Sequence, residues 1–171
     1  EGKNKQLKQL IDDHIAIGER LRFIGDEWSL ERDSLVAYIH DLERTDELER
    51  GVSRLEKEME ECISEGKQKI TQWKEDGFSV DDWFERVERA PKATLRDIAS
   101  DDALIVRAQD SIRALDKVDI SIDGGEDADE LRNLLYSDVH LDVILEAEEW
   151  TQSQIKRNER YRRRLLMSVT E

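Results

Sequence analysis

The acidic segment 119–130 is the part of this sequence whose residue types and spacing come nearest to a known binding chemistry. Counted from Asp119, oxygen-bearing side chains occupy loop positions 1, 3, 5, 9 and 12, and a glycine occupies position 6. This is the ligand spacing of a calcium-binding EF-hand loop. The spacing predicts a candidate divalent-cation site, with Ca²⁺ as the cofactor, formed by Asp119, Ser121, Asp123, Asp127 and Glu130.

The residues between these candidate ligands fit an EF-hand less well. Position 8 normally carries an aliphatic residue that pairs with a second loop, but here it is Glu126, and the sequence contains no second loop of this kind. We therefore favour the alternative interpretation, an acidic turn between two helices in which Asp127 or Asp129 caps the second helix.

A basic cluster near the end of the chain is the other local departure from the average composition. It consists of Lys156, Arg157, Arg160, Arg162, Arg163 and Arg164. Residues 155–171 carry about +4, whereas the whole chain carries −15, so the remainder carries about −19. The net charge of −15 on the whole chain repels polyanions. This repulsion disfavours nucleic acid as a partner, even though Tyr161 could stack on a base.

We expect the basic cluster to pair with acidic helices instead. The segment 41–65 holds ten acidic and four basic residues, so a helix from this chain or from a partner could neutralise the cluster. Trp150 is a further candidate interaction residue, because the residues around it, 148–154, are almost wholly polar and leave its indole in need of a covering surface.

Residues with catalytic potential are sparse. His14, His40 and His140 are isolated, and none has another histidine at the spacing that places two metal ligands on one helix face. The sequence contains no Gly-x-Ser-x-Gly turn and no glycine-rich phosphate loop. We expect no enzymatic activity, and a bundle enzyme with two metals is disfavoured because its Glu-x-x-His pairs are missing.

A seven-residue repeat runs through residues 1–73 and indicates the helices that carry the first part of the chain. One series of seam residues runs in steps of seven from Leu7 to Ile70, and the other from Leu10 to Trp73. Fourteen of the twenty seam positions are apolar or aromatic, which predicts coiled-coil helices. Polar seam residues cluster at Thr45, Glu49 and Glu56, and Gly25-Asp26 with Ser29 marks a second possible break. The segment is therefore either one long helix or two or three helices folded back near those points.

The rest of the chain predicts shorter helices and no strand. A capping box at Ser79 and the dipeptide Ala90-Pro91 bound one short helix, a second runs from about 101 to 118, and a third carries Leu131, Leu134 and Leu135. A last long helix spans about 139 to 167. We thus predict an all-α fold with three parts, 1–75 (coiled coil or helical hairpin), 79–136 (a head of short helices) and 139–171 (a long helix with a basic end).

Two arrangements of these parts are open: an antiparallel stalk of the first and last helices, or a homodimer. The segment 70–81 resembles a sequence motif found at helix junctions of acidic archaeal coiled-coil proteins. The resemblance implies an archaeal source but no activity. The single cysteine, Cys62, and the lack of a long apolar run favour a cytoplasmic compartment and no membrane partner.

For function, we expect a non-catalytic structural, scaffolding or protein-interaction module that uses its heptad helices to bind proteins or itself. Both ends have the sequence of a helix interior, which suggests that the chain is part of a longer protein. The alternative is a regulatory module in which a divalent cation binds the turn 119–130 and shifts the flanking helices.

Overall fold

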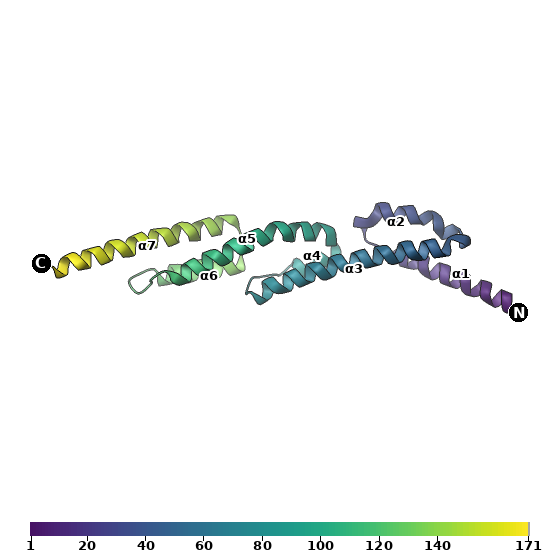
Figure 1. The fold of residues 1–171 in the computed structure, drawn as a ribbon, viewed down its shortest axis with the longest axis horizontal. Coiled ribbons are helices and arrows are strands. Elements are labelled where there is room, and N and C mark those ends of the chain that lie inside the picture. Colours follow the sequence, from purple (N-terminus) through teal and green to yellow (C-terminus); the bar gives the residue numbers. More distant parts are fainter. Residues whose placement is uncertain (171) are drawn as a thin grey trace. The chain divides into compact units, whose positions relative to one another are not determined.

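The computed structural model describes residues 1–170, and every regular element in this range is helical. The α-helices are α1 (Gly2–Leu21), α2 (Ser29–Val36), α3 (Thr45–Glu75), α4 (Trp83–Arg89), α5 (Pro91–Lys117), α6 (Gly125–Ser137) and α7 (Leu141–Val169) (Figure 1). The 3₁₀ helices are η1 (Asp26–Trp28), η2 (Ala37–His40) and η3 (Leu42–Arg44). The prediction of an all-α fold is confirmed, although the last predicted segment ends on Glu171, outside the described residues.

Contacts between Cα atoms divide the described chain into two units. Unit 1 comprises residues 1–69 and 82–96, and unit 2 comprises residues 70–81 and 97–170. The first and last helices, expected to form one antiparallel stalk, thus belong to different units. The helices α3 and α5 each contribute residues to both units.

In unit 1, the heptad segment is folded back at the two places where the sequence allowed a break. Helix α1 ends at Leu21, and a turn through Gly25 leads into η1 and α2. Helix α3 then begins at Thr45, whose hydroxyl donates to the Leu42 carbonyl at 2.8 Å. The alternative of a single long helix over residues 1–73 is therefore wrong.

The buried seam of α3 differs from the predicted one by one residue at three positions. We expected Glu49, Glu56 and Ile63 on this seam, but the side chains that pack inward are Leu48, Leu55 and Cys62. Glu49 and Glu56 instead lie beside the seam, where both accept hydrogen bonds from the guanidinium of Arg20. This shift explains why the polar interruptions cluster in the first half of α3.

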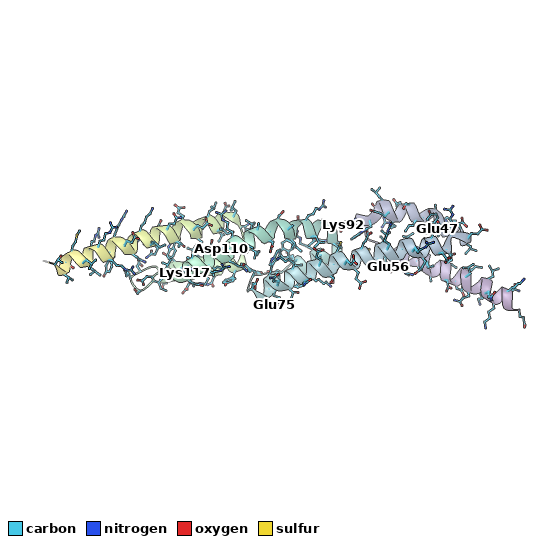
Figure 2. The ribbon with its side chains drawn as sticks, viewed as in Figure 1. Glu47, Glu56, Glu75, Lys92, Asp110 and Lys117 are labelled. Atoms are coloured by element: carbon cyan, nitrogen blue, oxygen red, sulfur yellow. The ribbon has the colours of Figure 1, made fainter. Side chains whose placement is uncertain are left out.

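The core of unit 1 joins α1, α2 and α3. Its buried residues are Ile17, Leu21, Ile24, Trp28, Leu35, Leu48, Val52 and Leu55. His14 lies at the edge of this core, and its two ring nitrogens contact the Thr45 hydroxyl at 2.8 Å and the Ile39 carbonyl at 2.7 Å. The expected structural role of this histidine on the seam agrees with these contacts, which tie α1 to the start of α3. Charged residues such as Glu47 lie on the exposed side of α3 (Figure 2).

The start of α5 also depends on a residue that is distant in sequence. Pro91 occupies the first position of α5, where its missing N–H costs no hydrogen bond. The carboxylate of Glu27 accepts hydrogen bonds from the backbone N–H groups of Lys92 and Ala93, each at 2.8 Å. This cap comes from another element, so α5 begins ten residues before the predicted start near residue 101.

In unit 2, a glycine ends α3 as the sequence predicted. Gly77 has φ +96°, and the Phe78 N–H donates to the Trp73 carbonyl at 3.0 Å while the Gly77 N–H donates to the Lys74 carbonyl at 3.1 Å. These two bonds form the Schellman arrangement that satisfies the last carbonyls of a helix. The Ser79 N–H then donates to the Tyr136 carbonyl at 2.9 Å, so the short helix α4 starts at Trp83 and not at the predicted capping box.

The core of unit 2 is formed mainly by one face each of α5, α6 and α7. Its buried apolar residues are Ile70, Trp73, Phe78, Val80, Ile98, Ile105, Ala108, Ile112, Leu115, Val118, Ala128, Leu131, Leu135, Ile144 and Ala147. On α7 the same inward stripe continues into polar residues, Thr151, Gln154 and Asn158, which are also buried. This polar part of the stripe holds the acidic turn.

Candidate functional site

The carboxylate of Asp119 is held by groups of its own chain. Its Oδ1 accepts hydrogen bonds from the Ser121 N–H at 3.0 Å and the Ser121 hydroxyl at 2.6 Å, and its Oδ2 accepts one from Arg162 at 2.6 Å. These bonds favour the ionised form, and the bonds from Ser121 contribute most. They lower the pKa of Asp119 from 3.8 to about 2.

The remaining candidate cation ligands lie on two different elements. Asp123 is in the turn and contacts Arg157 at 3.6 Å, whereas Asp127 and Glu130 lie on α6, which begins at Gly125. Within residues 1–170, no group of three or more histidine, cysteine or acidic side chains is placed to share a metal ion. The structure thus places Asp119, Ser121 and Asp123 in one turn and does not gather the full predicted set.

Two buried amides of α7 fasten this turn to the helix. Gln154 Nε2 donates to the Asp123 carbonyl and to Asn158 Oδ1, both at 3.1 Å, and Asn158 Nδ2 donates to the Asp119 carbonyl at 2.8 Å. Sequence reasoning missed both residues. The available signal was their spacing, because Thr151, Gln154 and Asn158 continue the stripe of Ile144 and Ala147 at helical intervals.

Trp150 is covered in part by its own chain. A Cβ built on Gly124 would lie 3.0 Å from Trp150 Cζ2, so the turn sits directly against the indole. The indole also lines a cavity of about 300 Å³ between α6 and α7, together with Asp127, Glu130, Leu131, Leu134 and Glu146. Trp150 therefore finds much of its covering surface within unit 2.

Two residues of the basic cluster form ion pairs within unit 2. Arg157 and Arg162 contact Asp123 and Asp119, so the acidic partners of these two lie in the same unit and not in the expected segment 41–65. The other candidate interaction residues are exposed on the last turns of α7: Lys156, Arg160, Tyr161, Arg163 and Arg164.

An NMR titration of the side-chain carboxyl groups should show a midpoint of about 2 for Asp119. Because this folded-state pKa is depressed, the stability that Asp119 contributes is complete above its ordinary pKa of 3.8 and is lost as the pH falls toward about 2. Ser121→Ala and Arg162→Gln should each raise the midpoint, because each variant removes a side-chain hydrogen bond to the carboxylate. A midpoint that is unchanged in both variants, or a wild-type midpoint at 3.8, would contradict this assignment.

Four exposed aliphatic side chains of unit 1 lie together on α1. We call this surface the α1 face; its members are Leu7, Leu10, Ile11 and Ile15, which are 52%, 40%, 36% and 57% exposed. Leu7 and Leu10 continue toward the N-terminus the seven-residue seam that is buried at His14, Ile17 and Leu21. The sequence showed this seam but could not show where its covering helices end.

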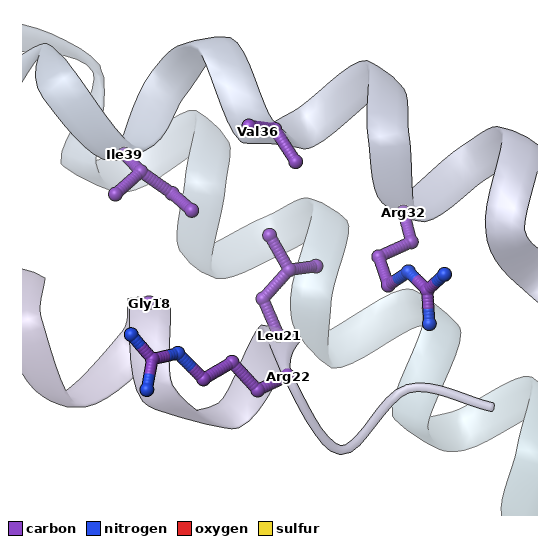
Figure 3. Close-up of a pocket in the computed structure, with 6 residues that line it drawn as sticks. All are labelled: Gly18, Leu21, Arg22, Arg32, Val36 and Ile39. Atoms are coloured by element: carbon purple, nitrogen blue, oxygen red, sulfur yellow. The ribbon is translucent and has the colours of Figure 1, made fainter. Parts of the chain in front are cut away.

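A shallow pocket continues the α1 face toward α2. Gly18 and Leu21 line it from α1, and Val36 and Ile39 line it from α2 and η2, around a volume of about 270 Å³ (Figure 3). The guanidinium groups of Arg22 and Arg32 also line this pocket (Figure 3). Gly18 follows Ile15 by three residues, so the two share one side of the helix.

The thiol of Cys62 has a structural environment. It is half-buried and packs against the core of unit 1. Burial raises the pKa of the Cys62 thiol above 9.0, and the nearby Glu65 carboxylate adds to this shift. A raised pKa leaves less of the reactive thiolate at neutral pH, which fits the filler role expected beside the seam.

The fold defines a class, an all-α protein, and in unit 1 helix α1 carries exposed aliphatic side chains. Comparison of the chain with protein-family models, with curated proteins and with solved structures finds no match. Within residues 1–170, no helix combines the length and the apolar character that crossing a bilayer requires.

Proposed function

We propose that this chain is a non-catalytic scaffolding or protein-interaction module, and that α1 is the helix with which it binds. One observation carries the proposal. The α1 face presents four large aliphatic side chains to solvent, and two of them lie in register with the buried heptad seam of the same helix.

The free energy available from covering this face is substantial. Each large aliphatic side chain contributes about 1.5–3 kcal/mol when it is fully buried, and roughly half of that remains to be gained at Leu7 and Ile15. Residues 1–13 are exposed on all sides, so a partner helix can approach without displacing any described element. A helix whose apolar stripe extends past its own neighbours is suited to pairing with another helix.

The heptad pattern favours a coiled-coil mode of pairing. Leu7, Leu10, His14, Ile17 and Leu21 alternate at intervals of three and four residues. The last three are covered inside unit 1, and the first two present the same seam outward. A partner helix that packs against Leu7 and Leu10 would extend the seam by knobs-into-holes contacts.

Affinity capture from extracts of the source cells tests this function. A triple variant, Leu7→Gln, Ile11→Gln and Ile15→Gln, removes three of the four side chains of the α1 face but keeps residues that favour helix. We expect the proteins recovered with the wild-type chain to fall about tenfold or more with this variant, since a loss of 1.4 kcal/mol already corresponds to a factor of ten.

The matched control for this capture is Phe23→Gln with Leu30→Gln. These side chains are 81% and 84% exposed, lie in the same unit, and are outside the α1 face. Circular dichroism should show equal helix content in the wild-type chain and both variants. Recovery that is unchanged in the triple variant, or reduced equally in the control, would contradict the proposal.

A further inference from the structure

Charged residues beside the α1 face are arranged with opposite signs on the two sides of Ile11. Lys5 and Lys8 precede Ile11 by six and three residues, and Asp12 and Glu19 follow it by one and eight residues. On a helical projection these four lie along the same edge of the α1 face. Lys5, Lys8 and Asp12 have no ion pair among the described residues, and Glu19 has only an exposed contact with Arg22 at 3.6 Å.

We propose that the occupant of the α1 face is α1 of a second copy, running antiparallel and centred on Ile11. This inference rests on the proposed function and names the partner of the same surface. In such a pair, the residues that precede Ile11 lie opposite the residues that follow it by the same number. Leu7 therefore packs against Ile15 of the second copy, Ile15 packs against its Leu7, and the two Ile11 side chains meet at the centre.

The charges along the edge are complementary in this register. Lys8 lies two residues, or about 3 Å along the axis, from the position opposite Asp12 of the second copy. Lys5 lies equally close to the position opposite Glu19 of the second copy. The two-fold symmetry repeats both pairs, so four oppositely charged contacts border the two paired α1 faces.

A parallel pair in register would not bring these charges together. Its two-fold axis runs along the helices, so the edge that carries Lys5, Lys8, Asp12 and Glu19 would lie on opposite sides of the interface in the two copies. The charge complementarity is therefore available only in the antiparallel orientation.

The surface at Gly18, next to the α1 face, has room for the second helix. Gly18 lies opposite Asn4 of the second copy, and a Cβ built on Gly18 would meet only Ile39 Cγ2 at 3.9 Å. The shallow pocket of Gly18, Val36 and Ile39 lies at this point and can receive the first turn of the partner helix (Figure 3).

Light scattering during size-exclusion chromatography and sedimentation equilibrium, from low micromolar to several hundred micromolar chain, test this inference. We expect the mass to rise from 20.0 kDa toward twice that value as the concentration increases. Variant A (Lys5→Glu, Lys8→Glu) and variant B (Asp12→Lys, Glu19→Lys) should each weaken the dimer about tenfold or more, because all four edge charges then have one sign. An equimolar mixture of A and B should recover the dimer, since every contact between the two variants is again opposite in charge.

A matched control for variant A is Lys74→Glu with Lys117→Glu. It makes the same change in net charge at two exposed lysines outside the α1 face, so its association should equal that of the wild-type chain. A dimer that is as strong in variants A and B as in the wild-type chain would overturn the inference, because a parallel pair or another surface would account for it.

A chain that stays monomeric at every concentration would also overturn the self-pairing. If capture of cellular proteins still depended on the α1 face, the proposed function would stand with a different partner. If both the dimer and the dependence on the α1 face were absent, the proposed function would fail as well.

Discussion

Replacing Trp28 with alanine should lower the free energy of unfolding of unit 1 by about 3–5 kcal/mol, the usual cost of removing a large aromatic side chain from a core. Trp28 is 0% exposed and belongs to the cluster that joins α1, α2 and α3. Its indole N–H also donates to Glu58 at 3.2 Å, and the Lys92 ammonium lies 4.4 Å from the ring centroid. The alanine variant loses the packing, the hydrogen bond and the cation–π contact together.

Urea denaturation followed by circular dichroism measures this loss. Phe23→Ala is the matched control, because its aromatic ring is 81% exposed and its removal should change stability by no more than about 0.5 kcal/mol. Trp28→Phe should fall between the two, since it keeps most of the apolar volume and loses the N–H bond. A cost at Trp28→Ala no greater than at Phe23→Ala would show that the indole does not anchor this core.

A methyl group at Gly124 should destabilise unit 2 by about 2–4 kcal/mol, which combines the cost of a left-handed conformation with that of overpacking. Gly124 has φ +91°, a conformation that residues with a Cβ rarely adopt. The new Cβ would also lie 3.0 Å from Trp150 Cζ2 and 3.2 Å from Gln154 Oε1. Gln154 is 1% exposed and cannot move without releasing its bond to the Asp123 carbonyl.

The neighbouring glycine provides the control for this prediction. Gly125 begins α6 with an ordinary negative φ, and a Cβ there would meet Ile120 Cδ1 at a normal 3.7 Å. Gly125→Ala should therefore change the unfolding free energy by no more than about 0.5 kcal/mol, or raise it slightly by restricting the unfolded chain. Hydrogen exchange should show faster exchange in residues 119–124 for Gly124→Ala only. Equal effects of the two alanines would mean that the turn is not pressed against α7.

Local signals in the sequence were sufficient for the helices themselves. The Asp76-Gly77 stop, the Ala90-Pro91 boundary and the 3.6-residue stripe through Ile105, Ala108 and Ile112 all correspond to observed features, because each depends on neighbours in the chain. The extension of α5 back to Pro91 was missed because its cap is the carboxylate of Glu27, more than sixty residues away. The cation-ligand spacing in the acidic turn was visible, but the pairing of Asp119 with Arg162 was not, for the same reason.

The sequence by itself determined that this chain is helical, that residues 1–73 carry a heptad seam, and that breaks near Gly25 and Thr45 were possible. Only the tertiary structure decided which seam residues are covered. Folding back α1, α2 and α3 buries His14, Ile17 and Leu21 and leaves Leu7 and Leu10 exposed, although all five belong to one periodic series. Periodicity is set by the pitch of a single helix, whereas burial depends on how far the neighbouring helices extend, which is a property of the whole fold.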